Sequence, residues 1–483
     1  MKRDENLKFE DLALEATLLK ALSGLGYHSP TPVQQQVIPL LLNNQSIIVK
    51  SKTGSGKTAA FGIPMIHKID WDIRSPQVLV LTPTRELAEQ VKTELFNIGR
   101  FKRMKVVSVY GKSPMKSQIR TLHEKTHIVV GTPGRLLDHL DRDTLNLSEI
   151  KYLVLDEADE MLNMGFLEDV EAIMKKCPRD IVKALLSATM PDAIRNLCDV
   201  YMASPVFIEI ESEQNKNDIA QSKYHVTKKE KMSLLYDLTK LHNPDQCMIF
   251  CNTRSEVDEV QSKLSKMGYP AKGLHGGMEQ EDRTRVMDQF RKRKFRYLVA
   301  TDVAARGIDI HDLSLVINYD VPEEAEVYVH RIGRTGRKET SGLALSLVTV
   351  NDYGYMEAIE ELLGEPIPLM TPPSQEALDL VETAFEDKLG CTLAHTPTKA
   401  DELNKSILKL HINAGKKTKM RAGDVVGAIC NLEGLTADDI GIINIIDVST
   451  FVEILNDKGE QVYKHLQHTP IKGRLRKVSR ANE

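Results

Sequence analysis

The chain has 483 residues, of which 41% are hydrophobic and 27% are charged, and its formal net charge is −4. That length is more than one hydrophobic core organises, so we expect three domains, or two domains with an appendage. The small negative charge excludes a uniformly basic nucleic-acid binder, so any nucleic-acid site must arise from a local patch.

Membrane, export and zinc signals are absent from the sequence. No apolar run approaches the ~18 residues of a membrane span, and the charged segment 1–10 differs from a signal peptide. The six cysteines form no CxxC pair, and the histidines show no zinc-ligand spacing. We therefore expect buried thiols, a reducing compartment and a cytoplasmic location.

A candidate phosphate-binding loop is the most informative motif of the chain. A strand predicted at 46–49 leads into SKTGSGKT at 51–58, and an apolar helical pattern follows. Ser51 stands where the general pattern has a glycine. The alternative interpretation is a flexible surface turn.

The residue types in this loop suit a nucleotide and its metal ion. Gly54 and Gly56 let backbone N–H groups approach a phosphate, and Lys57 reaches the β- and γ-phosphates. The Thr58 hydroxyl is a ligand for Mg²⁺. The loop therefore predicts a bound nucleotide phosphate together with Mg²⁺.

Short β-rich segments alternate with helical patterns from Val33 to about residue 210. This alternation predicts βαβ units and a parallel sheet. The strands are expected at 46–49, 78–82, 106–110, 127–130, 152–155 and 183–187.

A pair of carboxylates ends the predicted strand at 152–155. Asp156 is placed to bind a nucleotide-bound Mg²⁺, and Glu157 to orient and deprotonate an attacking water. A solvated acidic helix start is the alternative, and the phosphate loop about a hundred residues upstream argues against it.

A second set of alternating elements follows a polar linker at 211–221. Its strands are expected at 247–251, 297–301, 315–319 and 342–348. Ligands bind outside the carboxyl ends of parallel strands, so two such domains suggest a composite site in the cleft between them.

An arginine-rich loop, HRIGRTGR at 330–337, is the main chemical feature of the second domain. Arg334 and Arg337 are candidates to stabilise negative charge on a transferring phosphoryl group. Asp309 could accept hydrogen bonds from a ribose hydroxyl. An exposed basic loop without function is the alternative for the arginines.

The carboxyl-terminal part is predicted to hold a linker with a helix, at 367–403, and a small α+β module, at 404–483. Its predicted order βαββαβ is the RNA-recognition-motif arrangement. Aromatic residues are sparse on the expected sheet face, where only His411 and Phe451 stand, which argues against base stacking there.

Positive charge indicates how this module binds RNA. Basic residues gather in the loop after the first strand and near the carboxyl terminus, an arrangement that suits a phosphate backbone. A solvated basic face is the alternative. The candidate RNA contacts are Lys416, Lys417, Lys419, Arg421, Lys472, Arg474 and Arg476.

From about residue 9 to 365 the chain resembles the DEAD-box ATP-dependent RNA helicases, because about ten short motifs of that family occur in order. They include GYHSPTPVQ at 26–34, PTRELA at 83–88, TPGR at 132–135, SAT at 187–189 and ATDVAARGID at 300–309. The resemblance implies an α/β fold with two tandem RecA-like domains, at 1–210 and 222–366, ahead of the RRM-like module. It also implies RNA-stimulated hydrolysis of ATP.

The resemblance assigns roles residue by residue. It implies ATP contacts from Phe9, Tyr27, Gln34, Ser51, Thr53, Gly54, Ser55, Gly56, Lys57, Thr58, Gly307 and Asp309. It implies RNA contacts from Pro83, Thr84, Arg85, Gly111, Thr132, Pro133, Gly134, Arg135, Thr253, Gln280, Arg283 and Thr301. It implies that Asp159, Ser187, Thr189 and His330 couple the two ligands.

Some of these matches leave alternatives open. By resemblance, Gln34 makes a bidentate hydrogen bond to adenine while Tyr27 stacks on it; a plain helix-start residue is the alternative for Gln34. Tyr110-Gly111-Lys112 departs from the family's paired glycines. Lys112 could itself meet a phosphate.

The sequence INAGKKTKMRAGDVVGAI at 412–429 resembles the DbpA-type bacterial helicases. That resemblance implies recognition of a 23S ribosomal RNA hairpin and action on pre-50S particles in large-subunit assembly, by a monomer without DNA or membrane partners. A general helicase of mRNA metabolism with a non-specific tail is the main alternative, and a non-catalytic RNA clamp is another.

Two substitutions test the assigned catalytic roles. Lys57→Ala and Glu157→Gln are each expected to abolish ATP turnover, because one removes a phosphate contact and the other the base. An RNA-stimulated ATPase assay, with circular dichroism to confirm folding, measures both effects. Normal turnover in either variant would refute its assignment.

Overall fold

The computed structural model describes residues 7–51, 54–210, 219–305, 313–336, 342–391 and 403–481. These residues form two units, and each is described by itself. Of these residues, the first contains 7–51, 55–210 and 403–481, and the second contains 54, 219–305, 313–336 and 342–391.

A parallel sheet organises the amino-terminal part of the first unit. Among the described residues its strand order is β3-β4-β2-β5-β6-β1-β7, and every neighbouring pair is parallel. The strands are β1 (Ile47–Lys50), β2 (Val78–Leu81), β3 (Val106–Val109), β4 (Ile128–Gly131), β5 (Tyr152–Asp156), β6 (Val182–Ser187) and β7 (Val206–Glu209).

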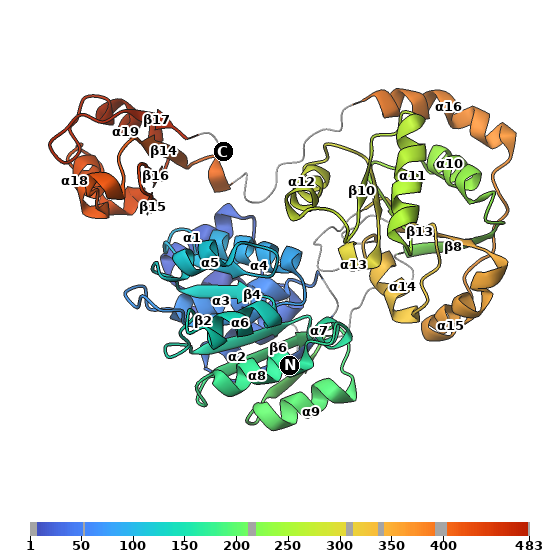
Figure 1. Cartoon of the computed structure of the whole chain (residues 1–483), viewed down its shortest axis with the longest axis horizontal. Coiled ribbons are helices and arrows are strands. Elements are labelled where there is room, and N and C mark those ends of the chain that lie inside the picture. The colour runs from blue at the N-terminus through green and yellow to red at the C-terminus, as the bar shows by residue number, and fades with distance from the viewer. Residues whose placement is uncertain are drawn as a thin grey trace. The chain divides into compact units, whose positions relative to one another are not determined.

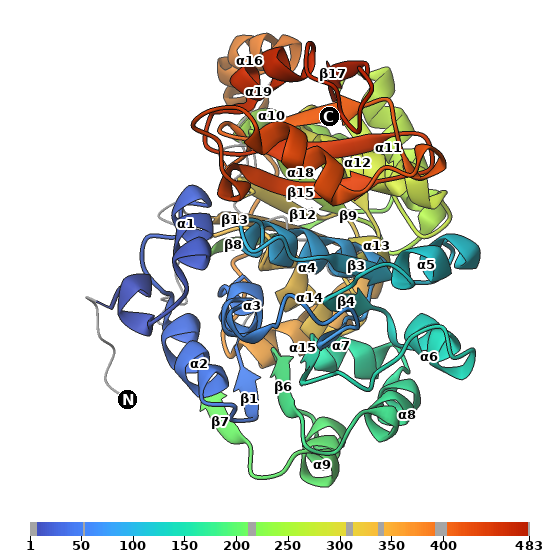
Figure 2. The same ribbon diagram turned by 90° about the vertical axis from the view of Figure 1, so that its left-hand side faces the viewer.

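Helices cover both faces of this sheet, and α2 lies beside α3 and β1 (Figure 2). Alternate residues of one strand enter opposite cores: Val78 and Val80 pack on one side, Leu79 and Leu81 on the other. Strands buried on both faces need continuous apolar runs, which the sequence supplies. The helices are α1 (Ala16–Gly24), α2 (Pro32–Leu42), α3 (Lys57–Lys68), α4 (Arg85–Ile98), α5 (Met115–Leu122), α6 (Pro133–Asp141), α7 (Ala158–Asn163), α8 (Leu167–Lys176) and α9 (Asp192–Tyr201), with a 3-10 turn at Phe9–Leu12.

The second unit contains another parallel sheet, of order β10-β11-β9-β12-β13-β8. Its strands are β8 (Ile219–His225), β9 (Cys247–Phe250), β10 (Ala271–Leu274), β11 (Tyr297–Ala300), β12 (Leu315–Asn318) and β13 (Gly342–Val348). Its helices are α10 (Lys231–His242), α11 (Arg254–Lys266), α12 (Gln280–Arg291), α13 (Asp302–Ala305), α14 (Ala325–Ile332), α15 (Tyr353–Leu363) and α16 (Gln375–Gly390), with a 3-10 turn at Val350–Asp352. The prediction of two RecA-like parallel-sheet domains is confirmed.

Three strands were not expected from the sequence. β7 and β8 lie at sheet edges and are only partly buried, so their sequences lack the continuous apolar run of a central strand. In β10, Lys272 and Gly273 interrupt the apolar run. β8 pairs with β13 along its whole length, from Ile219 opposite Gly342. The predicted linker at 211–221 therefore extends too far, because residues 219–221 belong to the second sheet.

The predicted linker at 367–403 is also wrong in its first part. Ile367 joins the core beside α14 and α15, and Leu369 bridges to Lys223 on β8. Helix α16 lies beside α10 (Figure 1). Its Phe385 side chain enters the core, with its ring centroid 5.5 Å from that of Tyr269. Residues up to Cys391 thus extend the second unit.

The carboxyl-terminal module has the predicted βαββαβ order and an antiparallel sheet of order β15-β16-β14-β17. Its elements are β14 (Leu408–Ile412), α18 (Ala422–Cys430), β15 (Ile440–Ile445), β16 (Thr450–Ile454), α19 (Gly459–Leu466) and β17 (Val478–Arg480), with 3-10 turns at Lys416–Thr418 and Ala437–Asp439. The final strand is short and begins only at Val478, after a turn in which Ile471 pairs with Arg474.

The expectation of buried thiols holds for four of the six cysteines. Cys391 is exposed and Cys430 is half-buried, since each lies at or beyond the end of a helix. Among the described residues, no helix is both long and apolar enough to cross a membrane.

Phe385→Ala tests whether α16 belongs to the second unit. We expect the substitution to destabilise that unit by about 3–5 kcal/mol, because it leaves a cavity among tyrosine rings. Calorimetry of the full chain measures the shift of the unfolding transition. Leu380→Ala is the control on the same helix, since Leu380 is 86% exposed; equal shifts in both variants would contradict the assignment.

Candidate nucleotide and RNA sites

The carboxyl ends of three adjacent strands bring together residues predicted to bind Mg²⁺, to contact ATP and to couple the two ligands. In the order β5-β6-β1, Asp156 ends β5, Ser187 ends β6, and Ser51 follows β1. The Ser51 N–H donates to the Ser187 carbonyl at 3.0 Å. Parallel strands end at the same edge of a sheet, so residues far apart in sequence become neighbours there.

The phosphate loop is closed by contacts among its own residues. Lys57 is 7% exposed, and its ammonium donates to the Ser51 carbonyl at 2.8 Å. The Ser51 and Ser55 hydroxyls lie 3.0 Å apart. Gly56 has a φ of 89°, and a Cβ there would lie 2.7 Å from Gln34 Nε2, so only glycine fits. Thr58 follows in the first turn of α3.

Gln34 connects the loop to helix α2. Its amide accepts from the Thr31 N–H at 2.9 Å and donates to the Gly56 carbonyl at 3.2 Å, and its side chain is fully buried. Gln34 therefore caps the start of α2 and also holds the phosphate loop; its contact with adenine stays a prediction. Phe9 packs edge-on against Tyr27, with ring centroids 6.2 Å apart, and the Tyr27 hydroxyl donates to Glu94.

Burial raises the pKa of the Asp156 carboxyl above its ordinary value. The positive charge of Lys57 and a hydrogen bond from the Glu157 N–H oppose that shift. Glu157 itself has a left-handed backbone, with φ at 53°, which a non-glycine residue adopts only when its surroundings impose it.

The residues at this edge fit a magnesium ion. The described residues contain no cluster of three or more His, Cys, Asp or Glu side chains that could form an all-protein metal site. Mg²⁺ commonly uses one or two carboxylates together with substrate phosphates and water. A single carboxylate at Asp156, at the end of β5, and the Thr58 hydroxyl, in the first turn of α3, suit that mode.

Asp159 joins helix α7 to the end of β6. Its carboxylate accepts from the Ala188 N–H at 3.1 Å, the Thr189 N–H at 2.7 Å and the Thr189 hydroxyl at 2.9 Å. The Asp159 N–H donates in turn to the Ser187 hydroxyl at 3.2 Å. The structure thus brings together three of the four residues predicted to couple ATP and RNA.

The predicted RNA contacts of the first domain follow the other strands of the sheet, in the order β3-β4-β2. Gly111 follows β3, Thr132–Arg135 follow β4, and Pro83–Arg85 follow β2. Thr84 caps helix α4 by accepting from the Leu87 N–H. Arg135 donates to the Ser113 carbonyl at 2.9 Å and to Gln118 at 3.0 Å, so its guanidinium contacts the protein.

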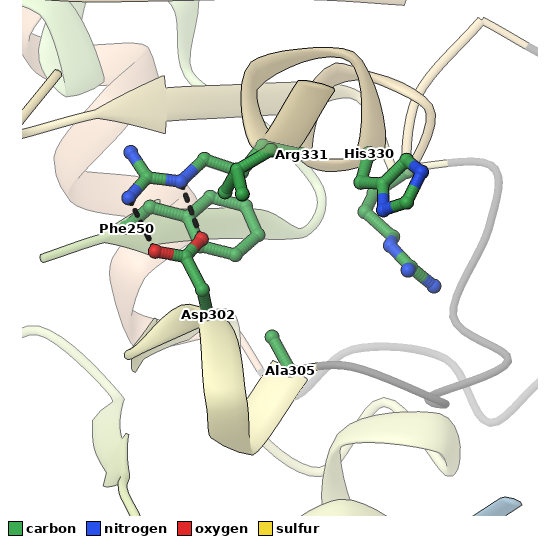
Figure 3. A pocket seen from close by; sticks show the side chains of 7 residues that line it. Phe250, Asp302, Ala305, His330 and Arg331 are labelled. Atoms are coloured by element: carbon green, nitrogen blue, oxygen red, sulfur yellow. Dashed lines mark hydrogen bonds and ion pairs between the residues drawn. The ribbon is translucent and has the colours of Figure 1, made fainter. Parts of the chain in front are cut away.

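In the second unit, His330, Arg331 and Arg334 line a small pocket of about 20 Å³ with Phe250, Asp302, Ala305 and Val327. Figure 3 shows the Arg331 guanidinium over the Phe250 ring and facing Asp302, while the His330 ring points away from that pair. Arg331 is 1% exposed and Arg334 is 8% exposed.

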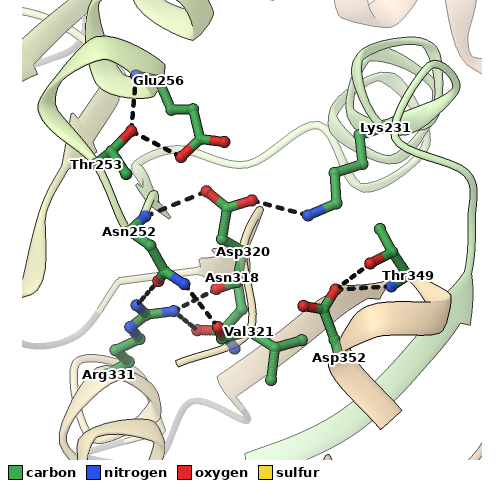
Figure 4. Close-up of polar contacts among 10 residues, drawn as sticks. All are labelled: Lys231, Asn252, Thr253, Glu256, Asn318, Asp320, Val321, Arg331, Thr349 and Asp352. Atoms are coloured by element: carbon green, nitrogen blue, oxygen red, sulfur yellow. Dashed lines mark hydrogen bonds and ion pairs between the residues drawn. The ribbon is translucent and has the colours of Figure 1, made fainter. Parts of the chain in front are cut away.

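Polar residues after β9 and β12 form a second group, shown in Figure 4. Thr253 caps helix α11, accepting from the Glu256 N–H at 3.2 Å and donating to the Glu256 carboxylate at 2.8 Å. Thr301 follows β11 and is buried, while Gln280 and Arg283 lie on the first turn of α12 and are half-buried.

The carboxyl-terminal module joins its two predicted basic segments. Lys472 donates to the Lys419 carbonyl and pairs with Asp424 at 3.1 Å. The first segment packs on the β15–β16 turn, because a Cβ at Gly415 would lie 2.1 Å from the Ile446 carbonyl. Arg476 is half-buried, and the other predicted cations are exposed: Lys416, Lys417, Lys419, Arg421, Lys472 and Arg474.

The same module pairs its two aromatic side chains. His411 and Phe451 are directly opposite on β14 and β16, with ring centroids 5.0 Å apart, and Lys409 lies 5.5 Å from the Phe451 ring. Both rings are half-buried. Cross-strand pairing thus assembles a small aromatic surface from residues that looked isolated in the sequence.

Four of the predicted site residues lie outside the described residues: Thr53, Gly307, Asp309 and Arg337. Five residues of the polar group of Figure 4 and the ion pair of Figure 3 were not expected from the sequence to have a role: Arg331, Asp302, Asn252, Asp320 and Lys231. Arg331 and Asp302 lie within the quoted motifs, but nothing in the sequence shows that their side chains form a buried ion pair.

Known families match the chain in all three parts. The DEAD/DEAH box helicase family matches residues 31–197, the helicase conserved C-terminal domain matches residues 230–339, and the DbpA RNA binding domain matches residues 409–480.

Individual relatives extend these matches. The ATP-dependent RNA helicase DbpA of Bacillus subtilis (strain 168) is 50% identical over 476 residues, which cover 98% of this chain and 99% of that protein. The ATP-dependent RNA helicase CshA of Listeria monocytogenes is 45% identical over 77% of this chain and 72% of its own. A solved structure of S. cerevisiae Dbp5 bound to RNA and ADP BeF3 has a TM-score of 0.70 and 32% identity, covering 79% of this chain and 99% of that one.

Gln34→Ala tests the link between α2 and the phosphate loop. We expect the KM for ATP to rise about tenfold with a smaller change in kcat, because two hydrogen bonds of about 1 kcal/mol each are lost. Steady-state ATPase kinetics measure both constants. Gln36→Ala, which changes a half-buried glutamine of the same helix, is the control; an unaltered KM in Gln34→Ala would contradict this role.

Proposed function

Because the chain belongs to the DEAD-box ATP-dependent RNA helicases, of the DbpA type, we propose that its carboxyl-terminal module directs it to a hairpin of 23S ribosomal RNA. There it locally unwinds RNA duplexes during assembly of the large ribosomal subunit. The observation that carries this proposal is the joined basic surface of an RRM-like module in a DbpA-type chain.

The first domain binds ATP and activates water. Lys57 and the loop N–H groups hold phosphate oxygens, and Gln34 keeps the loop in register with α2. Thr58 and Asp156 hold Mg²⁺, which when bound neutralises charge on the phosphates. Glu157 accepts the proton of the attacking water, and Arg334 and Arg337 stabilise the charge that develops on the phosphoryl group.

Asp159 connects hydrolysis to RNA binding. Its hydrogen bonds to Thr189 and Ala188 make the end of β6 and the start of α7 one rigid piece. A displacement at Asp156 or Glu157 is therefore transmitted to Ser187 and its neighbours. The affinities for ATP and RNA are then linked reciprocally.

RNA is bound along its backbone by residues at the carboxyl ends of both sheets. Helix starts and hydroxyls at such ends suit phosphate oxygens, and they carry no base-specific information. A bent single strand fits this surface better than a regular A-form duplex, so binding displaces one strand. The contacts proposed are those of Pro83–Arg85, Gly111, Thr132–Arg135, Thr253, Gln280, Arg283 and Thr301.

The carboxyl-terminal module supplies target choice. Exposed cations at 416–421 and 472–474 bind phosphates, and the His411–Phe451 pair with Lys409 offers a base-stacking surface next to a positive charge. A folded hairpin presents both a bent backbone and unstacked loop bases. This combination supports a hairpin as the target.

ATPase stimulation by different RNAs tests the target. The full chain is expected to reach half-maximal stimulation at a much lower concentration of a 23S fragment holding the hairpin than of an unrelated hairpin or polyuridine. The difference should diminish steeply as salt rises, because phosphate contacts release counterions. Equal stimulation by all three RNAs would favour the general mRNA helicase instead.

Charge-neutralising variants test which residues of the module confer the preference for the 23S fragment. Lys417→Gln/Lys419→Gln should raise the half-maximal concentration of the 23S fragment about tenfold or more, because two phosphate contacts are lost. Lys405→Gln/Lys464→Gln removes the same charge from other positions of the module and is the control. Loss of preference in the control variant alone would contradict the proposed surface.

A further inference from the structure

Arg331 is a fully buried cation whose hydrogen bonds join several loops of the second unit. Its Nε and Nη2 donate to the two oxygens of Asp302 at 2.5 and 2.6 Å. Nη1 donates to the Asp320 carbonyl at 2.6 Å and to Asn318 at 3.2 Å. Nη2 also donates to Asn252 at 2.9 Å. These contacts use all five N–H donors of the guanidinium group.

The acceptors of Arg331 follow three different strands. Asp302 begins α13 after β11, Asn252 follows β9, and Asp320 follows β12. The side-chain amide of Asn252 also donates to the Val321 carbonyl at 2.9 Å, and the backbone N–H of Asn252 donates to the Asp320 carboxylate at 3.1 Å. Asn252 is therefore fixed from two sides, by a side chain of α14 and by the loop after β12 (Figure 4).

A second buried cation supports the same turn from behind. Lys231, at the start of α10, pairs with Asp320 at 2.8 Å, and both side chains are largely buried. Asp320 thus accepts from Lys231 through one oxygen and from Asn252 through the other. Since a buried charge without its partner is costly, this arrangement has few alternatives of similar energy.

Two residues with proposed ligand contacts are attached to this network. Thr253, proposed to contact RNA, directly follows Asn252 in the chain. Arg334, proposed to act on the phosphoryl group, lies three residues beyond Arg331, just past the end of α14. The Arg331 guanidinium group therefore joins the turn after β9 to the end of α14.

We propose that Arg331 is a positioning residue that couples the RNA-contacting turn at Asn252–Thr253 to the phosphoryl-contacting Arg334. The inference rests on the proposed roles of Thr253 and Arg334. Arg331 touches neither ligand. It makes the turn and the helix end move as one body, so that occupancy of one ligand site favours the geometry the other ligand needs.

A purely stabilising role makes a different prediction. A side chain that only stabilises the fold changes the melting temperature and leaves the dependence of RNA affinity on nucleotide unchanged. The discriminating quantity is the coupling ratio, defined as the Kd for RNA without nucleotide divided by the Kd with ADP–beryllium fluoride and Mg²⁺.

Fluorescence anisotropy of a labelled single-stranded RNA bound to the full chain measures this ratio. Asn252→Ala removes the amide bridge and keeps the Arg331–Asp302 pair, and Asn252 is exposed, so the variant is expected to fold. Arg331→Lys keeps the charge and loses the planar fork. In both variants we expect the coupling ratio to fall about fivefold or more, within the usual range of such couplings.

Tyr328→Phe is the matched control on the same helix. It removes the partly buried hydrogen bond from the Tyr328 hydroxyl to Gln221, at 2.9 Å, which does not involve the turn after β9. Its coupling ratio should equal that of the unmodified chain. An unchanged ratio in Asn252→Ala, or an equal loss in Tyr328→Phe, overturns the proposal; should Arg331→Lys not fold, Asn252→Ala alone decides.

The unmodified chain reports separately on the proposed function. A ratio near one in that chain means that ATP and RNA binding are not coupled, which refutes the proposed function itself. A large ratio that survives in Asn252→Ala refutes only the role of Arg331.

Discussion

Parallel pairing of β-strands is the constraint on which the rest of this structure depends. Because every strand of the two large sheets runs in the same direction, the residue after each strand lies at one edge. Short polar sequences separated by tens of residues thereby become neighbours. In the first sheet that edge has two parts, with Asp156, Ser187 and Ser51 at β5-β6-β1 and the predicted RNA contacts at β3-β4-β2.

Burying charged groups at such an edge costs free energy, and hydrogen bonds and ion pairs with neighbouring groups offset that cost. Lys57, Asp156, Lys231 and Arg331 are each less than a tenth exposed. Each has a partner: a carbonyl for Lys57, an N–H for Asp156, and carboxylates for the other two. Removing one partner of a buried pair typically costs about 3–5 kcal/mol, so these groups keep the loops around them in one arrangement. That rigidity is useful where ligands must be held accurately.

The two large sheets use the same constraint for different purposes. At the first, a glycine-rich turn leaves backbone N–H groups available for phosphate, and Gln34 fixes the turn to α2. At the second, a guanidinium group with five acceptors fills the corresponding edge and joins three loops. The antiparallel module differs from both, since its chemistry lies on a sheet face and in connecting loops.

The sequence by itself determined the family, the two parallel sheets, the order βαββαβ of the small module and the position of the phosphate loop. These follow from local patterns, because buried strands require continuous apolar runs and phosphate loops require glycine at fixed spacing. Tertiary structure alone decided that β8 and α16 belong to the second unit, that His411 meets Phe451, and that the buried Arg331 finds five acceptor atoms on three loops. The physical reason is that edge strands, cross-strand pairs and the direction of a side chain depend on which distant segments pack against them, and the local sequence does not contain that information.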